Sequence, residues 1–504
     1  RADPLHQLVG EPTVGVELDG PGRLREGMHH RHQIVATVAP RSDDPTGERA
    51  SPLVAQHRIT MTHVEAVETG HPERLDRVRV GLVEDATDRD PHPRIVDRHD
   101  DLRSRATDQP STFTGVSNTT DAVVIGGGIA GVSIGYELCA RGLSVQLLEA
   151  EDSLAQHATG RSAAQYLETY GNESVRRLTV AGRSFFEEPP SELVDGPLWH
   201  PRPLMQACAP QHVERVRARA IELRALAPTT AFIDAADALA LMPVLRPEAV
   251  GGALLEPDAM ELDVAAIHQA FVRGMRSSQA AITSNAPVTA IARSGDGWIV
   301  TTPSATIAAP LVVNAAGAWC DQIAELAGIE PLGLRPLRRT AAVASLPADV
   351  GDIGSWPLVA FESEEGGMAA YCKPEPGGLL ISPADETLSP PCDARPEEID
   401  VARAMDVVGQ WTTLELRHIR TTWAGLRTFV ADRTPVAGFA PTAPGFFWLA
   451  AQGGYGIQTA PGLARAAAGL ILDGELPADL ASAGLTPENL APSRAGIRGT
   501  LAAG

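Results

Sequence analysis

The sequence lacks the features that mark membrane-spanning, disulfide-stapled and nucleic-acid-binding proteins. No apolar run reaches the roughly 18 residues of a membrane-spanning helix, and no signal-peptide pattern opens the chain. The five cysteines are scattered, which indicates neither a disulfide framework nor a zinc site. The net charge of -21 disfavours a nucleic-acid partner, because phosphate binding needs a basic surface. We therefore expect a cytoplasmic protein with no transmembrane segment, no metal site and no nucleic-acid partner.

Aromatic residues are absent from the first 112 residues, which carry nine of the 14 histidines and densely mixed charges. Such a composition offers little large apolar surface to offset the entropy of ordering the backbone. The spacing of His29, His30 and His32 fits no common metal-ligand pattern. We expect residues 1–118 to be a disordered or non-native extension, with the folded part beginning near Thr119.

The most specific feature is a βαβ pattern over residues 122–149. A short β-branched run leads into a glycine turn, a helix-like segment and a second apolar run closed by Glu149. Gly126 permits a tight turn, Gly128 lets the backbone approach a pyrophosphate, and Gly131 lets helix and strand pack closely. The helix N-terminus offers free N–H groups to phosphates, and Glu149 is placed to accept hydrogen bonds from a ribose. This order of elements predicts a dinucleotide-binding unit.

The rest of the chain alternates between helical and strand-like patterns. Apolar spacing predicts helices at 174–188, 210–225 and 262–278, strands at 287–291, 298–300, 311–317 and 446–450, antiparallel strands over 339–382, and a final alanine-rich helix ending near 472. Signals of the nucleotide domain occur early, in the middle and at the end. The pattern predicts an α/β fold in which one mostly parallel sheet is assembled from separated segments, with an inserted sheet domain.

Several motifs, taken in order, resemble those of FAD-dependent D-amino acid oxidases and dehydrogenases. They are the glycine turn with Glu149 and the stretches at 159–164 (TGRSAA), 314–319 (NAAGAW), 423–427 (WAGLR) and 452–458 (QGGYGIQ). The likeness covers about residues 119–490, and within the family it is greatest to the bacterial D-arginine dehydrogenases.

The resemblance implies a two-domain α/β fold. It places a discontinuous Rossmann-like FAD-binding domain at 119–190, 262–335 and 425–490, a substrate-binding domain with a mixed or antiparallel sheet at 191–261 and 336–424, and a tail at 491–504.

The same resemblance implies FAD, bound non-covalently. The ribose would meet Glu149, the adenine would meet the backbone of Val288, and residues 159–164 would lie along the pyrophosphate and the ring. The helix beginning near Gly454 would direct its N-terminus at the pyrimidine side of the flavin, where it stabilises negative charge. The residues implied to contact the cofactor are Gly126, Gly128, Ile129, Ala130, Gly131, Glu149, Thr159, Gly160, Arg161, Ser162, Ala163, Ala164, Val288, Ala316, Gly317, Trp319, Gly453, Gly454, Tyr455, Gly456, Ile457 and Gln458.

A substrate amino acid needs its carboxylate held, and Arg427 is the first candidate. It sits in an apolar run, where a buried guanidinium must find an anion. A guanidinium grips a carboxylate with two parallel hydrogen bonds. The alternative is a salt bridge with Asp432 or another acid.

Three further residues complete the expected catalytic set. Arg338 and Arg339 are neighbours in a strand, so only one of them faces a given site; the family pattern selects Arg339. Tyr170 and Tyr371 match family positions that meet the substrate carboxylate and line the pocket. Their alternative role is that of half-buried core tyrosines.

The resemblance also places seven residues around the substrate pocket: Gln165, Leu167, Leu204, Leu358, Ala360, Gly454 and Gln458. The acid that grips the cationic side chain in D-arginine dehydrogenases falls on Leu204, while a histidine falls on Gln165 and a threonine on Leu167. An unpaired buried charge costs several kcal/mol. We therefore expect D-arginine and D-lysine to be poor substrates and neutral, apolar D-amino acids to be preferred.

The implied reaction transfers a hydride from the substrate Cα to flavin N5, giving an imino acid that hydrolyses to a 2-oxo acid and ammonia. The electron acceptor, whether oxygen, a quinone or another carrier, stays open. Three alternatives also stay open. One is a sarcosine, glycine or N-methyl amino acid oxidase or an opine-type dehydrogenase of the same fold; another is a nicotinamide-dependent dehydrogenase; the third is a flavin-binding subunit or sensor without turnover.

Overall fold

The computed structural model describes residues 118–364 and 367–502, which all belong to one compact unit, Val96–Gly504. The expectation about residues 1–117 lies outside the described residues.

A six-stranded sheet carries the βαβ unit. Its order is β10 (Ala281–Thr283), β3 (Val145–Leu148), β2 (Ala122–Ile125), β14 (Leu311–Asn314), β22 (Phe446–Ala450) and β21 (Val436–Phe439). All pairs are parallel except the edge pair of β21 and β22. The strands come from segments far apart in the sequence. Four inner strands are buried along their whole length, which explains why they are mostly apolar.

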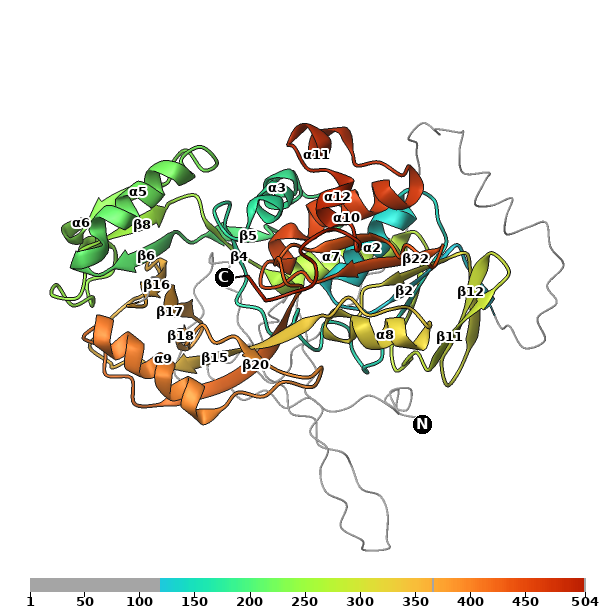
Figure 1. Ribbon diagram of the computed structural model, residues 1–504. Helices are drawn as coiled ribbons and strands as arrows, with labels where there is room; N and C mark the ends of the chain where they lie inside the picture. The colour runs from blue at the N-terminus through green and yellow to red at the C-terminus, as the bar shows by residue number, and fades with distance from the viewer. Residues whose placement is uncertain (1–117, 365–366, 503–504) are drawn as a thin grey trace, which may run out of the picture. The chain divides into compact units, whose positions relative to one another are not determined.

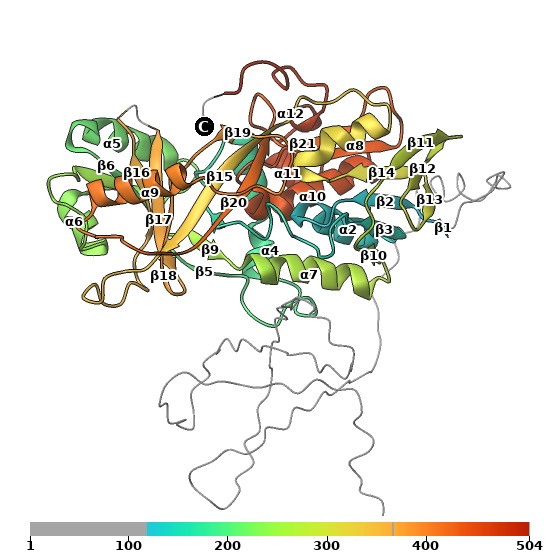
Figure 2. The ribbon, with the colours of Figure 1, turned by 90° about the horizontal axis from the view of Figure 1, so that it is seen from below.

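Both faces of this sheet are covered (Figures 1 and 2). One face packs against α2 (Ile129–Ala140), α7 (Val264–Ser277) and α10 (Gly456–Leu472). The other face packs against α8 (Cys320–Leu326) and a sheet of β1 (Asn118–Thr119), β13 (Thr306–Ala309), β12 (Gly297–Thr301) and β11 (Ala290–Ser294). Alternate residues of each central strand supply the two cores.

A second, nine-stranded sheet is mostly antiparallel. Its order is β19 (Thr387–Leu388), β15 (Arg335–Ala344), β18 (Gly378–Ser382), β17 (Met368–Glu375), β16 (Leu358–Glu362), β6 (Leu204–Cys208), β8 (Gly252–Glu256) and β7 (Ala231–Asp234), with β20 (Ile419–Phe429) paired to β15. Only β6 and β16 run parallel. One face packs against α6 (Ala235–Leu241) and α9 (Glu398–Trp411). The other face carries a smaller apolar cluster that includes Tyr371.

Smaller elements connect the two sheets. They are the three-stranded sheet of β4 (Gln165–Tyr166), β9 (Met260–Leu262) and β5 (Trp199–Pro201), the helices α3 (Glu173–Ala181), α4 (Arg183–Glu187), α5 (Val213–Leu223), α11 (Ala478–Ser482) and α12 (Pro487–Leu490), and the short turns η2 (Pro210–His212) and η3 (Gly317–Trp319). In Figures 1 and 2, β15 and β20 run between the part of the molecule that holds the nine-stranded sheet and the part that holds the six-stranded sheet.

The α/β architecture with a discontinuous parallel sheet and a second, mostly antiparallel sheet is confirmed. Three details differ from the prediction. The helix expected at 174–188 is divided at Gly182, because a Cβ there would lie 3.1 Å from Gly462 N in α10. The strand expected at 287–291 begins only at Ala290, since Pro287 has no N–H for a ladder bond. The last helix begins at Gly456 rather than Gly454. The domain boundaries stay a prediction.

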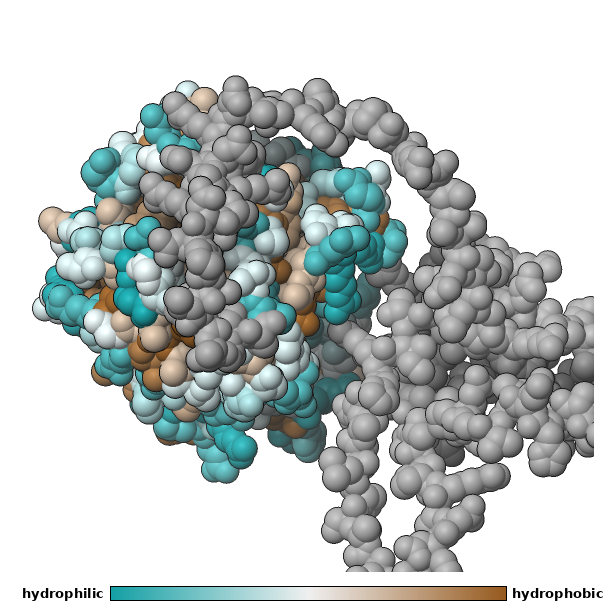
Figure 3. All heavy atoms as spheres, turned by 90° about the vertical axis from the view of Figure 1, so that its right-hand side faces the viewer, coloured by the Kyte–Doolittle hydropathy of each residue, from teal (hydrophilic) through white to brown (hydrophobic). Residues whose placement is uncertain are grey.

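Within the described ranges, no helix combines the length and apolarity needed to cross a membrane. On the face shown in Figure 3, hydrophilic and hydrophobic residues are interspersed over the atoms that are not grey.

Candidate active site

One cavity of about 720 Å³ lies at the carboxyl ends of β2, β14 and β22, where open α/β sheets bind their ligands. Its volume is in the range of small-molecule and cofactor sites. Most of the predicted nucleotide-binding residues line this cavity together with Arg339, Tyr371 and Arg427, whereas Tyr170 does not line it. The two sets of predicted residues therefore belong to one site.

The glycine turn brings backbone to the cavity wall. Gly126 has a φ of +109°, and a Cβ on it would lie 2.5 Å from the carbonyl oxygen of Ala315. A Cβ on Gly131 would lie 1.8 Å from the carbonyl oxygen of Gly126. Gly128 is the N-cap of α2 and lines the cavity. Only glycine tolerates these positions, and the turn leaves the N-terminus of α2 open to a pyrophosphate.

Two side chains fix the turn from its flanks. Thr159 Oγ1 accepts a hydrogen bond from Ile129 N at 3.0 Å, at the first residue of α2. The two carboxylate oxygens of Glu149 accept hydrogen bonds from Gly127 N at 2.7 Å and Glu151 N at 2.9 Å. The remaining lone pairs of this carboxylate can still accept from ribose hydroxyls.

Most of the predicted cofactor residues line the cavity. They are Gly126, Gly128, Ile129, Ala130, Glu149, Thr159, Arg161, Ser162, Ala163, Val288, Ala316, Gly317, Trp319, Gly453, Gly454, Gly456 and Ile457.

Five predicted cofactor residues do not line it: Gly131, Gly160, Ala164, Tyr455 and Gln458. Gly131 packs against Gly126, and a Cβ on Gly160 would lie 2.3 Å from the carbonyl oxygen of Ala155. Ala164 packs in the core beside α2 and α10. The Tyr455 hydroxyl donates to the backbone carbonyl of Arg433. The Gln458 amide bonds to both backbone groups of Leu167 and to Thr179 Oγ1. These five residues pack or bond behind the residues that line the cavity, and their predicted contact with the cofactor stays a prediction.

Arg161 lines the cavity, but its guanidinium binds protein groups. Nη1 donates to the carbonyl oxygens of Ala394 at 2.9 Å and Ala424 at 3.0 Å, and Nη2 pairs with Asp393. The side chain is therefore paired within the protein and ties the loop before β4 to β20, while the contact of Arg161 with the cofactor stays a prediction.

Sequence reasoning missed His157 and Gln452, which both line the cavity. His157 Nε2 lies 2.8 Å from Glu151 Oε1, and its ring centroid lies 4.6 Å from that of Trp319. His157 Nδ1 and Gln452 Nε2 are buried without a hydrogen-bond partner among the described residues. Such orphaned groups are costly unless a ligand satisfies them, so the cavity suits a cofactor rich in hydrogen-bonding groups. Gln452 directly precedes the predicted glycine pair, a position that could have revealed it.

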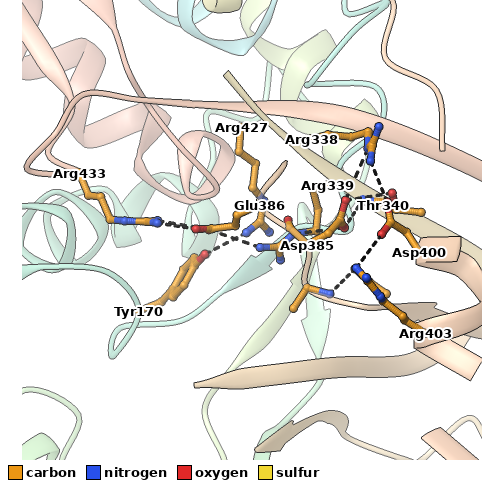
Figure 4. A network of polar contacts seen from close by, with 12 residues as sticks. Tyr170, Arg338, Arg339, Thr340, Asp385, Glu386, Asp400, Arg403, Arg427 and Arg433 are labelled. Atoms are coloured by element: carbon orange, nitrogen blue, oxygen red, sulfur yellow. Dashed lines mark hydrogen bonds and ion pairs between the residues drawn. The ribbon is translucent and has the colours of Figure 1, made fainter. Parts of the chain in front are cut away.

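Arg427, in β20, donates from Nη1 to the Tyr170 hydroxyl at 3.3 Å (Figure 4). No carboxylate of the described residues lies within ion-pairing distance of it. The alternative partner, Asp432, is instead bound by Arg494 through contacts of 2.7 and 2.9 Å. Burial alone would lower the pKa of Arg427, but Tyr170, Tyr371 and the Glu386 carboxylate raise it. The salt-bridge alternative is therefore wrong, and the guanidinium stays free for an anion.

The two adjacent arginines of β15 diverge, as strand alternation predicts (Figure 4). Arg338 pairs with Asp400 at 2.9 Å and with Glu397. Arg339 lines the cavity, donates from Nε to the backbone carbonyl of Asp385 at 2.8 Å, and lies 3.5 Å from Glu386 Oε1.

The charges of Arg339 and Arg427 shift the pKa values at this part of the cavity, although Arg339 also lies 4.0 Å from Asp385 Oδ1. Burial and the nearby charge of Arg427 lower the pKa of Arg339. Burial alone would raise the pKa of Tyr371, but Arg339, Arg427 and a hydrogen bond with Ser382 bring that pKa below its ordinary value. An anion bound beside Arg339 and Arg427 would offset the repulsion that Arg339 experiences from Arg427.

Position 454 leaves no room for a side chain, because two functional side chains lie against it. A Cβ there would lie 2.7 Å from Arg427 Cζ and 2.9 Å from the Tyr170 hydroxyl. The glycine thus gives the arginine and the tyrosine room at the cavity wall.

Six of the seven predicted pocket residues do not line the cavity, Gly454 being the exception. Leu167, Leu204, Leu358 and Ala360 pack in an apolar cluster with Tyr371, which does line it. Gln165 is 9% exposed, and both of its amide atoms lack partners among the described residues. The Gln458 amide bonds the backbone of Leu167. Ala360 is directly opposite Tyr371 in the paired strands β16 and β17, so the apolar cluster lies beside a side chain that lines the cavity. The pocket role of the six residues stays a prediction.

Comparison with known proteins identifies the family to which this chain belongs. The model of the DAO family, described as FAD dependent oxidoreductase, matches residues 121–470. The chain belongs to this family. This DAO-family chain is an FAD-dependent oxidoreductase, and the cradle of glycine backbone and orphaned polar atoms fits that cofactor.

Its curated relatives include a dimethylglycine dehydrogenase and a glycine oxidase. Human mitochondrial dimethylglycine dehydrogenase is 25% identical over 389 residues, covering 73% of this chain and 44% of that protein. Glycine oxidase of Geobacillus kaustophilus is 23% identical over 384 residues, covering 74% of this chain and 95% of that protein. The chain thus spans less than half the length of the dimethylglycine dehydrogenases that it matches.

Solved structures show the same fold. L-proline dehydrogenase from P. horikoshii has a TM-score of 0.62 at 22% identity, over 71% of this chain and 94% of that one. L-amino acid deaminase from Proteus vulgaris has a TM-score of 0.62 at 15% identity, over 77% of this chain and 99% of that one. The finer likeness to D-arginine dehydrogenases stays a prediction.

Proposed function

We propose that this chain oxidises the carbon–nitrogen bond of small amino acids with uncharged side chains, of the D-configuration that the sequence predicts. The observation that carries the proposal is Arg427, a guanidinium on the cavity wall with no acidic partner among the described residues. Arg339 lines the same cavity, so two cations are available for one carboxylate.

FAD supplies the hydride acceptor of such a reaction. The protein binds and orients. Arg427 and Arg339 can grip the carboxylate, and the hydroxyls of Tyr170 and Tyr371 flank it. Fixing the carboxylate at two points also fixes which side of the substrate Cα is presented, a near-attack arrangement. The N-terminus of α10 lines the same cavity, where its N–H groups stabilise negative charge.

The apolar layer beside Tyr371 supports an uncharged side chain. Leu204, at the position where the resemblance expects an acid, is 3% exposed and packs with Leu358 and Ala360. The carboxylate opposite Leu204, that of Glu256, already accepts hydrogen bonds from Glu168 N and Thr169 Oγ1. An ammonium or guanidinium placed against the apolar side chains would therefore be buried without a free anionic partner, which costs several kcal/mol. This supports the proposed exclusion of D-arginine and D-lysine.

A second candidate is oxidation of N-methylated glycines. It is favoured by the dimethylglycine dehydrogenase and glycine oxidase relatives. Such substrates carry the same carboxylate and need no side-chain pocket, so they suit the same pair of guanidiniums.

Anaerobic reduction of the FAD-loaded protein by a panel of amines tests the proposal. Neutral D-amino acids should bleach the flavin, with D-leucine or D-methionine acting faster than D-arginine. If sarcosine or dimethylglycine bleaches it faster than any D-amino acid, the second candidate holds. If no amine bleaches the flavin, both candidates fail and a binding subunit or sensor remains. Arg403→Ala, a change of an arginine side chain that is 67% exposed, serves as the control.

A further inference from the structure

We propose that Glu256 is a positioning residue for the carboxylate site: it anchors the turn at residues 168–170 and thereby holds Tyr170 against Arg427. The inference rests on the proposed function, because it concerns the same anion site.

Glu256 lies on the substrate side of the nine-stranded sheet. It is the last residue of β8 and stands directly opposite Leu204 in β6. Directly opposed residues of antiparallel strands share a face, so its side chain emerges on the face that bears the apolar cluster with Tyr371. It is 2% exposed.

Both carboxylate oxygens of Glu256 are engaged by the turn. Oε1 accepts a hydrogen bond from Glu168 N at 2.8 Å, and Oε2 accepts one from Thr169 Oγ1. No lysine or arginine of the described residues forms an ion pair with it, and burial raises its pKa. A buried carboxyl without a counter-ion is destabilising on its own account. What it provides is a pair of acceptors for two neighbouring residues.

The residues on either side of this turn are held by hydrogen bonds to other parts of the molecule. Leu167 bonds to the Gln458 amide through both backbone groups, each at 3.2 Å. Asn172 Nδ2 donates to Thr434 Oγ1 at 2.8 Å. Residues 168–170 between them form neither helix nor strand. The middle of the segment is held by Glu256 together with two arginines: Arg176 Nε donates to the Thr169 carbonyl at 3.1 Å, and Arg183 Nη1 donates to Glu168 Oε1 at 2.7 Å. Of these three side chains, only Glu256 bonds both the Glu168 amide and the Thr169 hydroxyl.

Tyr170 directly follows the anchored Thr169. Its hydroxyl accepts a hydrogen bond from Arg427 Nη1 at 3.3 Å. Its ring packs edge to face with the Tyr455 ring, with 5.6 Å between the two ring centroids. Releasing Thr169 would free Tyr170 to move away from Arg427, and the carboxylate site would lose one of its polar groups.

A different role for Glu256 would be to bind a cationic substrate side chain in place of the acid missing at Leu204. The engagement of both its oxygens by Glu168 and Thr169 disfavours that role. The two roles differ in what they predict for a simple carboxylate, which has no side chain to bind.

The test titrates sodium acetate into the FAD-loaded protein and follows the flavin absorbance. Glu256→Leu should weaken acetate binding by roughly tenfold or more, the value of hydrogen bonds to a charged group. Glu256→Gln keeps the shape and can bond both Glu168 N and Thr169 Oγ1, so it should restore most of the affinity. In a Tyr170→Phe background, Glu256→Leu should weaken acetate binding by less than a further factor of about two, because both residues act through the contact between Tyr170 and Arg427. The matched control is Glu248→Gln, at a side chain that is 73% exposed.

Hydrogen exchange gives a readout that does not depend on any ligand. The amides of residues 168–170 should exchange faster in Glu256→Leu than in wild type, with the rest of the chain unchanged. If Glu256→Leu does not fold, Thr169→Val removes one of the two bonds and should show the same pattern at smaller size.

Three results would overturn the inference: unchanged acetate affinity with unchanged exchange, fully additive losses with Tyr170→Phe, or a loss confined to reduction by D-lysine and D-arginine. Arg427→Ala separates this failure from failure of the proposed function. If Arg427→Ala abolishes acetate binding and Glu256→Leu does not, only the inference fails; if Arg427→Ala binds acetate like wild type, the carboxylate site itself is wrong.

Discussion

Arg339 and Arg427 stand beside each other on two paired strands. Arg339 is opposite Gly425, and Arg427 is opposite Leu337, so the two arginines are diagonal neighbours on one face of the β15–β20 ladder. Burial lowers the pKa of Arg339, and the like charge of Arg427 lowers it further. A neutral residue in place of either arginine would avoid this repulsion. The presence of two arginines is therefore the physical reason for assigning the pair to an anionic ligand.

Replacing Arg427 by alanine separates function from stability. We expect kcat/KM for the best amino acid to fall by about a hundredfold or more, since two charge-assisted hydrogen bonds are lost. The melting temperature should fall by a few degrees at most, because Arg427 has no ion-pair partner among the described residues. Arg427→Lys keeps the charge but cannot form two parallel hydrogen bonds to a carboxylate. Its kcat/KM should therefore lie between the values of wild type and Arg427→Ala. Unchanged kcat/KM with a lowered melting temperature would show that Arg427 is structural.

Tyr371 gives the site a pH dependence with a definite sign. Because Arg339 and Arg427 lower its pKa, the phenol ionises at a lower pH than an ordinary tyrosine. The phenolate adds a negative charge to an anion site, so acetate affinity should fall as the pH rises toward and through that lowered pKa. Tyr371→Phe should abolish this alkaline loss. Titrations of acetate at a series of pH values check it, and identical profiles for the two proteins would refute it.

At the scale of elements, the N-terminus of α10 meets the end of β20 through a glycine. Gly454→Ala places a methyl group 2.7 Å from Arg427 Cζ, so one of the two must move. We expect at least a tenfold loss of acetate affinity with FAD retained. Gly409→Ala in α9 is the matched control: its added Cβ meets nothing within 4 Å, so affinity should not change. Equal affinities of the two variants would mean that Gly454 does not shape the site.

The start of α2 depends on a side chain from another segment. Thr159 Oγ1 accepts from Ile129 N, a helix N-terminal donor that has no partner within its own helix. Thr159→Ala should lower stability by about 1 kcal/mol, as loss of a helix cap does. It should also weaken FAD binding measured by equilibrium dialysis. Thr159→Ser should restore both. Normal FAD affinity in Thr159→Ala would show that the cap and the cofactor site are independent.

At the scale of the whole molecule, the parts set by local pattern could be predicted from the sequence. The turn at Gly126–Gly131, the buried strand at 446–450 and the opposite directions of Arg338 and Arg339 all follow from steric and periodic rules acting within a few residues.

What the sequence could not provide was contact between distant segments. Gln458 was expected in the pocket, but it bonds Leu167, 291 residues away. Arg161 was expected on the cofactor, but it is neutralised by Asp393. Glu256 carried no sequence signal, because its role depends on the cross-strand pairing of β6 with β8 and on a turn 87 residues distant. Such partners are fixed by tertiary packing, which no local pattern encodes.

The measurement that tests the central claim most directly compares an amino acid with its own methyl ester. The FAD-loaded protein is mixed anaerobically with the amino acid that reduces it fastest, and separately with the ester, and the flavin absorbance is followed. The ester keeps the amine and the side chain but removes the negative charge that Arg339 and Arg427 are proposed to bind. We predict that the amino acid bleaches the flavin and that the ester is at least about a hundredfold slower. Equal rates, or no bleaching by any amino acid, would contradict the account.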